Sequence, residues 1–208
     1  MPTFTCATCG NSFSLSQKTL DQYPGWTPKQ CRDCRTGTRR PTRRASAREE
    51  DLTLDQVLAK YTEGPTDGVF TDGAADPNPG PGGWGAVWVR DGRVVHAEHG
   101  HDPHTTNNRM ELTALIAAYG MLPEDEATTI WTDSNLSVNI VTKWAPGWAA
   151  RGWTRKGGEI ANLDLVQELY ALAQRHPHVE LRWIKAHAGS RWNEYADSLA
   201  TAYRRDTL

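Results

Sequence analysis

The 208-residue chain lacks a long apolar segment. Its longest apolar run, Leu112 to Leu122, is interrupted by Thr113 and Gly120. It is too short to cross a bilayer, which takes about 20 consecutive apolar residues. Residues 1–6 also lack the basic and then apolar pattern of a secretory signal. We therefore expect a cytoplasmic protein with no membrane partner.

Cysteine is missing from the chain after Cys34, and the four that exist form two pairs, Cys6 with Cys9 and Cys31 with Cys34. The rest of the chain is long enough to bury a core without disulfides. Two such pairs about twenty residues apart predict one structural Zn²⁺, because each pair supplies two thiolates of a tetrahedral site from one tight turn. A redox-active pair is the alternative, but neither pair lies in the βαβ pattern that such a motif accompanies.

Basic residues are scarce in the larger part of the chain. Residues 49–208 contain 14 Lys and Arg and 23 Asp and Glu. Residues 1–48, in contrast, contain nine Lys and Arg and only two Asp. Between Arg35 and Arg48 no apolar residue is larger than alanine, so this stretch cannot bury a face. A basic arm on an acidic domain predicts attraction to a polyanion such as nucleic acid. A solvated linker without a binding role is the alternative.

The pattern of apolar residues predicts the layout of the remainder. Three strand-like runs, the second and third joined by a hairpin turn, are followed by alternating helical and strand-like segments. This order predicts an α/β fold with a mixed five-stranded sheet and helices on both faces. Together with the cysteine pairs it predicts four segments: a zinc ribbon over 1–35, an Arg-rich flexible linker over 36–50, a short docking helix over 51–63 and a larger domain over 64–208.

Four carboxylates stand out in the larger domain. Asp72 and Asp133 each end a strand-like run, Glu111 lies near the start of a helix and Asp197 lies on the last helix. If the two strands are neighbours, these side chains converge. Clustered carboxylates raise one another's pKa, and hard divalent cations offset that repulsion. Taken singly, each acid is more simply a surface residue or a helix-terminal charge.

Six short motifs surround these acids in one order along the chain: Phe70–Gly73, Asn78–Gly83, Thr106–Leu112, Thr132–Ser134, Arg151–Trp153 and His187–Gly189. Together they resemble type I ribonuclease H, over about two thirds of the chain. The resemblance implies the ribonuclease H fold for 64–208. It also implies an endonuclease that cuts the RNA strand of RNA–DNA hybrids and leaves 5′-phosphate and 3′-hydroxyl ends. Residues 4–35 are similar to small bacterial zinc-ribbon domains, which adds a metal but no activity.

The resemblance also implies roles for individual residues. Asp72, Glu111, Asp133 and Asp197 would bind two Mg²⁺ ions, with Mn²⁺ as an alternative. His187, ten residues before Asp197, would move protons or assist product release. The residues expected near the hybrid are Asn78, Thr106, Asn107, Asn108, Asn135, Trp144 and Asn162. Thr106 and Asn162 match a family pocket for a DNA-strand phosphate.

Simpler interpretations exist for several of these residues. Turn and capping chemistry also explains asparagines at such positions. Trp148 and Trp153 are expected to pack rather than to bind. The acid Asp76, close to Asp72, departs from the family pattern and suits a turn.

Two other functions compete with the hydrolase. One is a nucleic-acid-binding zinc-ribbon protein with an inactive domain, and the presence of all four acids argues against it. The other is a nuclease of the same fold with a different specificity, such as a transposase or a junction resolvase. The Asn78–Gly80 turn and the His187 loop favour the hydrolase over this one. We expect a monomer whose partner is an RNA–DNA hybrid.

Overall fold

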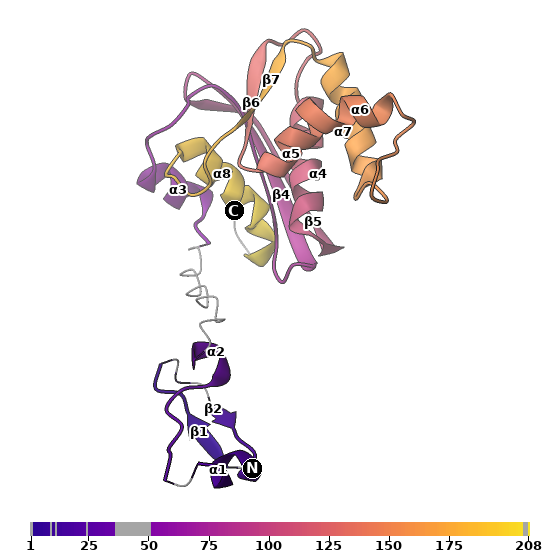
Figure 1. Cartoon of the computed structure of the whole chain (residues 1–208). Coiled ribbons are helices and arrows are strands. Elements are labelled where there is room, and N and C mark those ends of the chain that lie inside the picture. Colours follow the sequence, from indigo (N-terminus) through magenta and orange to yellow (C-terminus); the bar gives the residue numbers. More distant parts are fainter. Residues whose placement is uncertain (1, 9, 11, 24, 36–50, 206–207) are drawn as a thin grey trace. The chain divides into compact units, whose positions relative to one another are not determined.

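A computed structural model describes residues 2–8, 10, 12–23, 25–35, 51–205 and 208. The chain divides into two compact units, Met1–Glu50 and Asp51–Leu208 (Figure 1). The linker predicted over 36–50 lies outside the described residues. Each unit is therefore considered separately.

The first unit is built on a small antiparallel hairpin. Strands β1 (Thr3–Thr5) and β2 (Ser12–Ser14) pair so that Phe4 lies opposite Phe13, with ring centroids 5.9 Å apart. Two short helices follow, α1 (Gln17–Asp21) and α2 (Arg32–Arg35). Cys6 therefore comes directly after β1, while Cys31 and Cys34 lie at α2.

The second unit is organised around one mixed sheet with the strand order β5-β4-β3-β6-β7. Its first three strands in sequence pair antiparallel, and β6 and β7 add in parallel on the other side of β3. The bounds are β3 Gly68–Ala75, β4 Gly80–Arg90, β5 Arg93–Thr105, β6 Thr128–Thr132 and β7 Val179–Trp183. The predicted five-stranded mixed sheet is confirmed.

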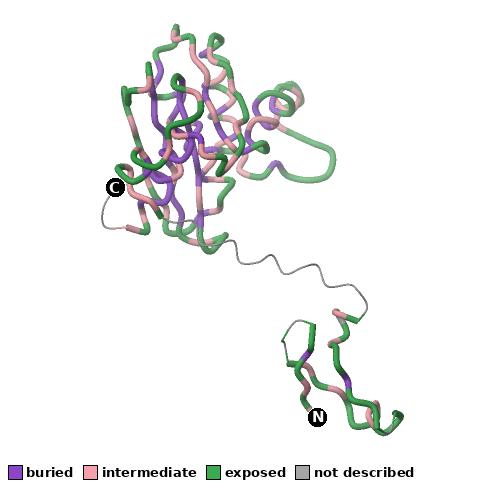
Figure 2. The backbone as a smooth tube through the Cα atoms, turned by 90° about the vertical axis from the view of Figure 1, so that its left-hand side faces the viewer, coloured by how far each residue is buried: buried purple, intermediate pink, exposed green. Residues whose placement is uncertain are grey.

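Helices cover both faces of this sheet, as predicted (Figure 1). The helical bounds are α3 Leu54–Lys60, α4 Asn107–Gly120, α5 Asn135–Asn139, the π-helix η1 Ile140–Trp144, α6 Ala145–Ala149, α7 Leu163–Arg175, α8 Arg191–Ala200 and the 3-10 helix η2 Ala202–Arg204. Successive strand residues point to opposite faces. Val69 accordingly packs with α4 and α7, and Phe70 packs with α3 and α8. Figure 2 shows that the buried residues gather inside this unit.

Several predicted boundaries are wrong. The sequence predicts a helix from Ser134 through Trp144, but the helical segment passes through the π-helix and continues as α6. The sequence also predicts a last helix from Arg191 to Tyr203, but α8 ends at Ala200 and a separate 3-10 turn follows. Asn107 and Asn108, residue types that the sequence favours as caps of this helix, do not cap α4. The cap is Thr106, whose hydroxyl accepts a hydrogen bond from the Arg109 N–H at 3.3 Å.

Candidate active site

The strand register explains why the acids converge. In the parallel pairing of β3 with β6, Thr71 lies opposite Thr132, so the next residues, Asp72 and Asp133, follow side by side. Asp72 was predicted to end its strand but lies inside β3, because β3 continues beyond β6 in its antiparallel pairing with β4. The carboxylate oxygens of Asp72, Glu111 and Asp133 lie within 4.8 Å of one another.

Gly73 lets α4 touch the sheet backbone. A Cβ atom at Gly73 would lie 2.2 Å from the backbone nitrogen of Glu111 and 2.3 Å from the carbonyl carbon of Met110. Such distances are far below van der Waals contact, so a glycine is needed for α4 to approach this closely. The close approach brings Glu111 beside Asp72.

Gly85 does the same for α8 on the opposite face. It is the cross-strand partner of Asp72, and a Cβ atom there would lie 2.4 Å from Leu199 Cβ and 2.6 Å from the Ala196 carbonyl oxygen. Helix α8 therefore rests on the backbone of β4. The residue after Ala196 is Asp197, which this contact places near the other acids.

The electrostatics show that all four acids share one neighbourhood. Burial raises the pKa of Asp72 well above its ordinary value of 3.8, and the charges of Glu111, Asp197 and Asp133 raise it further. Burial likewise raises the pKa of Glu111, with Asp133 adding to the shift and a hydrogen bond to Thr132 opposing it. Asp197 lies outside the set of three with oxygens within 4.8 Å but acts on Asp72.

These residues fit a hard divalent cation. Glu111 Oε2 is buried and accepts no hydrogen bond from the residues that the structure describes. A buried carboxylate oxygen without a donor is unfavourable unless a proton or a cation satisfies it. Several carboxylate oxygens converging on one point form the donor set that Mg²⁺ and Mn²⁺ prefer.

His187 lies in the loop between β7 and α8. Its side chain is exposed and its backbone has a left-handed φ of +47°.

Trp183, at the end of β7, was not singled out from the sequence. Its indole N–H donates a hydrogen bond of 3.0 Å to the Asp133 carbonyl oxygen, which holds the backbone of that acid. No sequence signal separates Trp183 from the other tryptophans.

Two of the expected substrate contacts tie the turn after β3 to the start of α4. The Asn107 Oδ1 atom accepts a hydrogen bond of 2.6 Å from the Ala75 N–H, and the Asn107 N–H donates to Asn78 Oδ1 at 3.2 Å. Both asparagines are exposed. The nearby Asp76 N–H donates to the Pro81 carbonyl oxygen at 3.0 Å, which agrees with the predicted turn role.

Thr106 and Asn162 are connected through Arg109, a cation that the sequence analysis missed. The Arg109 N–H bonds to the Thr106 hydroxyl, and its guanidinium donates to Asn162 Oδ1 at 3.4 Å. The same guanidinium pairs with Asp164 at 3.0 Å. That hydrogen bond is the main reason why the pKa of Asp164 is lowered. The only available signal was that Arg109 lies within a motif already recognised.

A hollow of about 100 Å³ brings three of the expected contacts to one surface. Asn108, Trp144 and Asn162 line it together with Leu136 and Arg155. The Trp144 side chain is 41% exposed, and its ring lies 5.9 Å from that of Trp148. Trp148 and Trp153 pack against the core, as predicted. Asn135 is exposed at the start of α5, where it accepts a hydrogen bond from Asn139.

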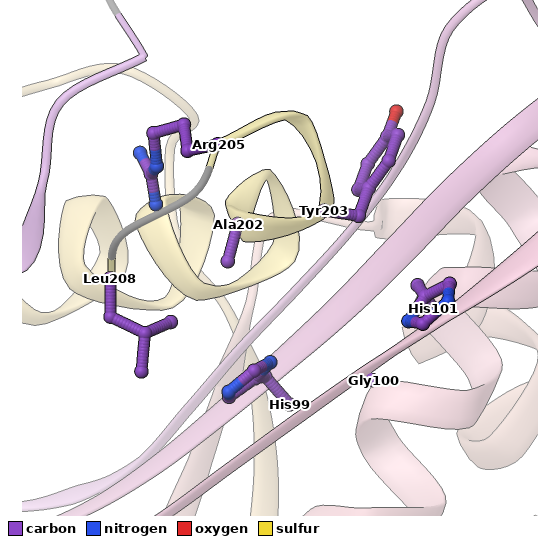
Figure 3. Close-up of a pocket in the computed structure, with 7 residues that line it drawn as sticks. All are labelled: His99, Gly100, His101, Ala202, Tyr203, Arg205 and Leu208. Atoms are coloured by element: carbon purple, nitrogen blue, oxygen red, sulfur yellow. The ribbon is translucent and has the colours of Figure 1, made fainter.

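A second hollow, of about 250 Å³, lies between β5 and the C-terminal end of the chain (Figure 3). His99 and His101 of β5 line one side of it, and Tyr203, Arg205 and Leu208 line the other. It contains none of the four carboxylates, and no residue predicted from the sequence falls within it.

In the first unit, the sulfur-bearing side chains cluster. The sulfur atoms of Cys6, Cys31 and Cys34 lie within 4.8 Å of one another, and Cys6 Sγ accepts a hydrogen bond of 3.3 Å from the Cys31 N–H. Cys9 lies outside the described residues. Three converging sulfur ligands are compatible with a zinc ribbon.

Within the described part of the chain, no helix is both long and apolar enough to cross a bilayer.

The Gly73 contact yields a first prediction. Gly73→Ala is expected to destabilise the protein by more than about 1–3 kcal/mol, because the added methyl group must displace helix backbone. It should also weaken binding of Mn²⁺, since Glu111 moves away from Asp72. Gly120→Ala is the matched control, because nothing lies within 4 Å of a Cβ atom there. Thermal melting and Mn²⁺ titration check both. A Gly73→Ala protein as stable as the control would contradict the close approach.

The raised pKa of Asp72 yields a second prediction. The folded protein binds the proton on the Asp72 carboxyl group more tightly than the unfolded chain does. The stability that this protonated carboxyl contributes is therefore fully present below the ordinary pKa of 3.8, and it is lost as pH rises through the raised pKa. Metal-free Asp72→Asn should therefore melt several degrees above metal-free wild type at pH 8, given roughly 2–4 °C per kcal/mol. The difference should shrink at pH 5. A pH-independent difference would contradict this origin.

Comparison with known proteins agrees with the geometry. The ribonuclease H family model matches residues 66–205. A protein of Methylorubrum extorquens named Ribonuclease H is 47% identical over 140 residues, which is 67% of this chain and 60% of that protein. Another of the same name, from Granulibacter bethesdensis, is 44% identical over 66% of this chain and 91% of its own length.

Solved structures similar to this chain also include ribonucleases H. The crystal structure of LC9-RNase H1, described as a type 1 RNase H with the type 2 active-site motif, is 36% identical with a TM-score of 0.54. The match covers 68% of this chain and 74% of that one. The foamy viral protease-reverse transcriptase in complex with an RNA/DNA hybrid has a TM-score of 0.56 at 16% identity, over 72% of this chain and 20% of that one, and shows only the shared fold. The chain belongs to the ribonuclease H family.

Proposed function

We propose that this protein is a metal-dependent endonuclease that hydrolyses the RNA strand of RNA–DNA hybrids. One observation carries the proposal: Asp72, Glu111 and Asp133 bring their carboxylate oxygens within 4.8 Å of one another in a chain of the ribonuclease H family. Relatives that are 43–47% identical are themselves named Ribonuclease H. That the protein acts as a monomer in the cytoplasm stays a prediction.

The four carboxylates would hold the metal. We assign two Mg²⁺ or Mn²⁺ ions to Asp72, Glu111, Asp133 and Asp197, which when bound would activate a water and neutralise charge on the phosphate. The water oxygen forms the new bond to phosphorus, and the bond to the ribose 3′ oxygen breaks. The leaving oxygen takes up a proton, so the products carry 5′-phosphate and 3′-hydroxyl ends. Gly73 and Gly85 hold the acids in place for this step.

We assign His187 to proton transfer or product release. Its exposed side chain lies in a loop that precedes α8, the helix that carries Asp197. Imidazole changes charge near neutral pH, which suits a group that hands a proton to a leaving oxygen. An exposed loop position also lets the side chain reach a bound phosphate without strain on the sheet.

The hollow beside α4 is our proposed hybrid contact surface. Trp144 offers an exposed aromatic face for a sugar, and Arg155 supplies a cation beside Asn108. Arg109 adds a second cation between Thr106 and Asn162, which suits a DNA-strand phosphate. The exposed side chains of Asn78, Asn107 and Asn135 are small and polar, as expected for readers of 2′-hydroxyls in the broad minor groove.

The first unit is our proposed tether. We assign one Zn²⁺ to Cys6, Cys9, Cys31 and Cys34. Tyr23 and Trp26 are 54% and 44% exposed, with ring centroids 6.1 Å apart. Trp26 also lines a hollow of about 470 Å³ together with Lys29 and Arg35. Exposed aromatic rings beside cations are typical of surfaces that stack on the bases of a single strand.

A labelled RNA–DNA hybrid tests the enzymatic proposal. With Mg²⁺, the wild-type protein should cut the RNA strand of the hybrid and leave duplex DNA and duplex RNA intact. Asp133→Asn should lose cleavage by more than about a hundredfold while keeping hybrid affinity, because the metal site loses a charged ligand and the contact surface does not change. The control is Glu168→Gln, on the exposed side of α7. Cleavage by Asp133→Asn within a few-fold of wild type would remove this acid from the mechanism.

A single-stranded RNA oligonucleotide tests the tether. Trp26→Ala should weaken binding of the full chain by about tenfold, since stacking on a base contributes roughly 1–3 kcal/mol. Trp26→Phe should keep most of the affinity because it keeps a ring. Lys29→Ala should also weaken binding, whereas Lys18→Ala, on α1 and outside the hollow, should not. Fluorescence anisotropy measures the affinity, with zinc content as a check of folding. Unchanged affinity in Trp26→Ala would exclude this surface.

A further inference from the structure

The segment before the family domain is built into the catalytic unit. Residues 51–65 precede the family match at 66–205, yet they belong to the same compact unit. Helix α3 starts with a complete capping box, in which Thr53 and Gln56 bond to each other's backbone N–H groups. Val57 of this helix is 1% exposed and packs among Phe70, Trp192 and Leu199.

After α3, the chain runs directly beside the start of α8. The Glu63 carbonyl oxygen accepts a hydrogen bond of 2.8 Å from the Arg191 N–H, and Glu63 forms a parallel bridge with Ser190. Gly64 adopts a φ of +104°, and a Cβ atom there would lie 2.4 Å from Ser190 Oγ. A side chain at Gly64 would therefore have to displace the Ser190 side chain, and it would adopt a backbone conformation that favours glycine.

These contacts fall on the end of the loop that carries His187. The loop's Gly189 donates its N–H to Glu194 Oε1 at 3.2 Å, and Glu194 is buried within α8. A Cβ atom on Gly189 would lie 3.8 Å from the Tyr61 ring. The end of the loop is thus held by α8 on one side and by Glu63 and Gly64 on the other, with the Tyr61 ring close by, two to four residues after His187.

We propose that Tyr61 to Gly64 is a positioning segment that holds the His187 loop in its productive place. The inference rests on the function proposed above for His187. The contacts described above join this segment to α8 and to the end of the loop, so its effect should pass through the loop. Loss of the contact would let the loop end move without disturbing Asp72, Glu111 or Asp133.

The competing interpretation is that the segment only adds stability to the core. A purely structural role predicts a lower melting temperature with unchanged turnover below it. A positioning role predicts reduced turnover in a protein that is still folded. The kinetic constants separate the two, because KM should stay near wild type when the hybrid contact surface is unchanged.

The test uses the full chain with a labelled hybrid and saturating Mg²⁺. Gly64→Ala should lower kcat by about five- to twentyfold with KM within about twofold, because the methyl group must push Ser190 away. Tyr61→Ala removes the packing without backbone strain and should lower kcat in the same direction. Leu169→Ala is the control: it empties a buried position on α7, on the other face of the sheet, and should lower the melting temperature but not kcat.

A double-mutant cycle with His187→Ala identifies the route of the effect. If the segment acts through the loop, Gly64→Ala should reduce kcat little further in the His187→Ala background. A full additional loss there would overturn the inference, as would wild-type kcat in both Gly64→Ala and Tyr61→Ala. If His187→Ala itself keeps wild-type kcat, the role assigned to His187 is wrong and the inference fails with it. If kcat falls in His187→Ala but stays at the wild-type value in Gly64→Ala and Tyr61→Ala, the role of His187 stands and only the positioning segment is refuted.

Discussion

The repulsion among buried carboxylates is the constraint on which the rest of the catalytic unit depends. Asp72 is buried, and Glu111, Asp197 and Asp133 each raise its pKa further. The fold would be more stable if these side chains were separated and exposed to water. Here the parallel pairing of β3 with β6 and two helices pressed onto the sheet force them together. The arrangement makes sense when a divalent cation supplies the missing positive charge.

Backbone contacts, rather than side-chain packing, set the geometry of the site. Gly73 and Gly85 let α4 and α8 approach opposite faces of the sheet at the level of Asp72. Contacts between backbones leave little freedom for adjustment. The acids are therefore held before any metal or substrate arrives, which is what preorganised electrostatic catalysis requires.

Much of this could be predicted from the sequence, and the failures have physical causes. The order of motifs predicted the fold and the converging acids, because strand periodicity and glycine turns are local properties. The position of Asp72 inside β3 depends on β4 pairing beyond the end of β6, which is not local. Arg109 bonds to Asn162 and Asp164 more than 50 residues away, and Tyr61 to Gly64 meets Ser190 only after folding. Contacts between distant segments leave no periodic pattern to read.

Anomalous diffraction from crystals grown with Mn²⁺ tests the central claim most directly. The account predicts manganese bound by the carboxylate oxygens of Asp72, Glu111 and Asp133 at about 2 Å, with Glu111 Oε2 among the ligands. Asp197 should face the same ions. Manganese absent from these carboxylates at concentrations that support hybrid cleavage, or bound by other residues instead, would contradict the account.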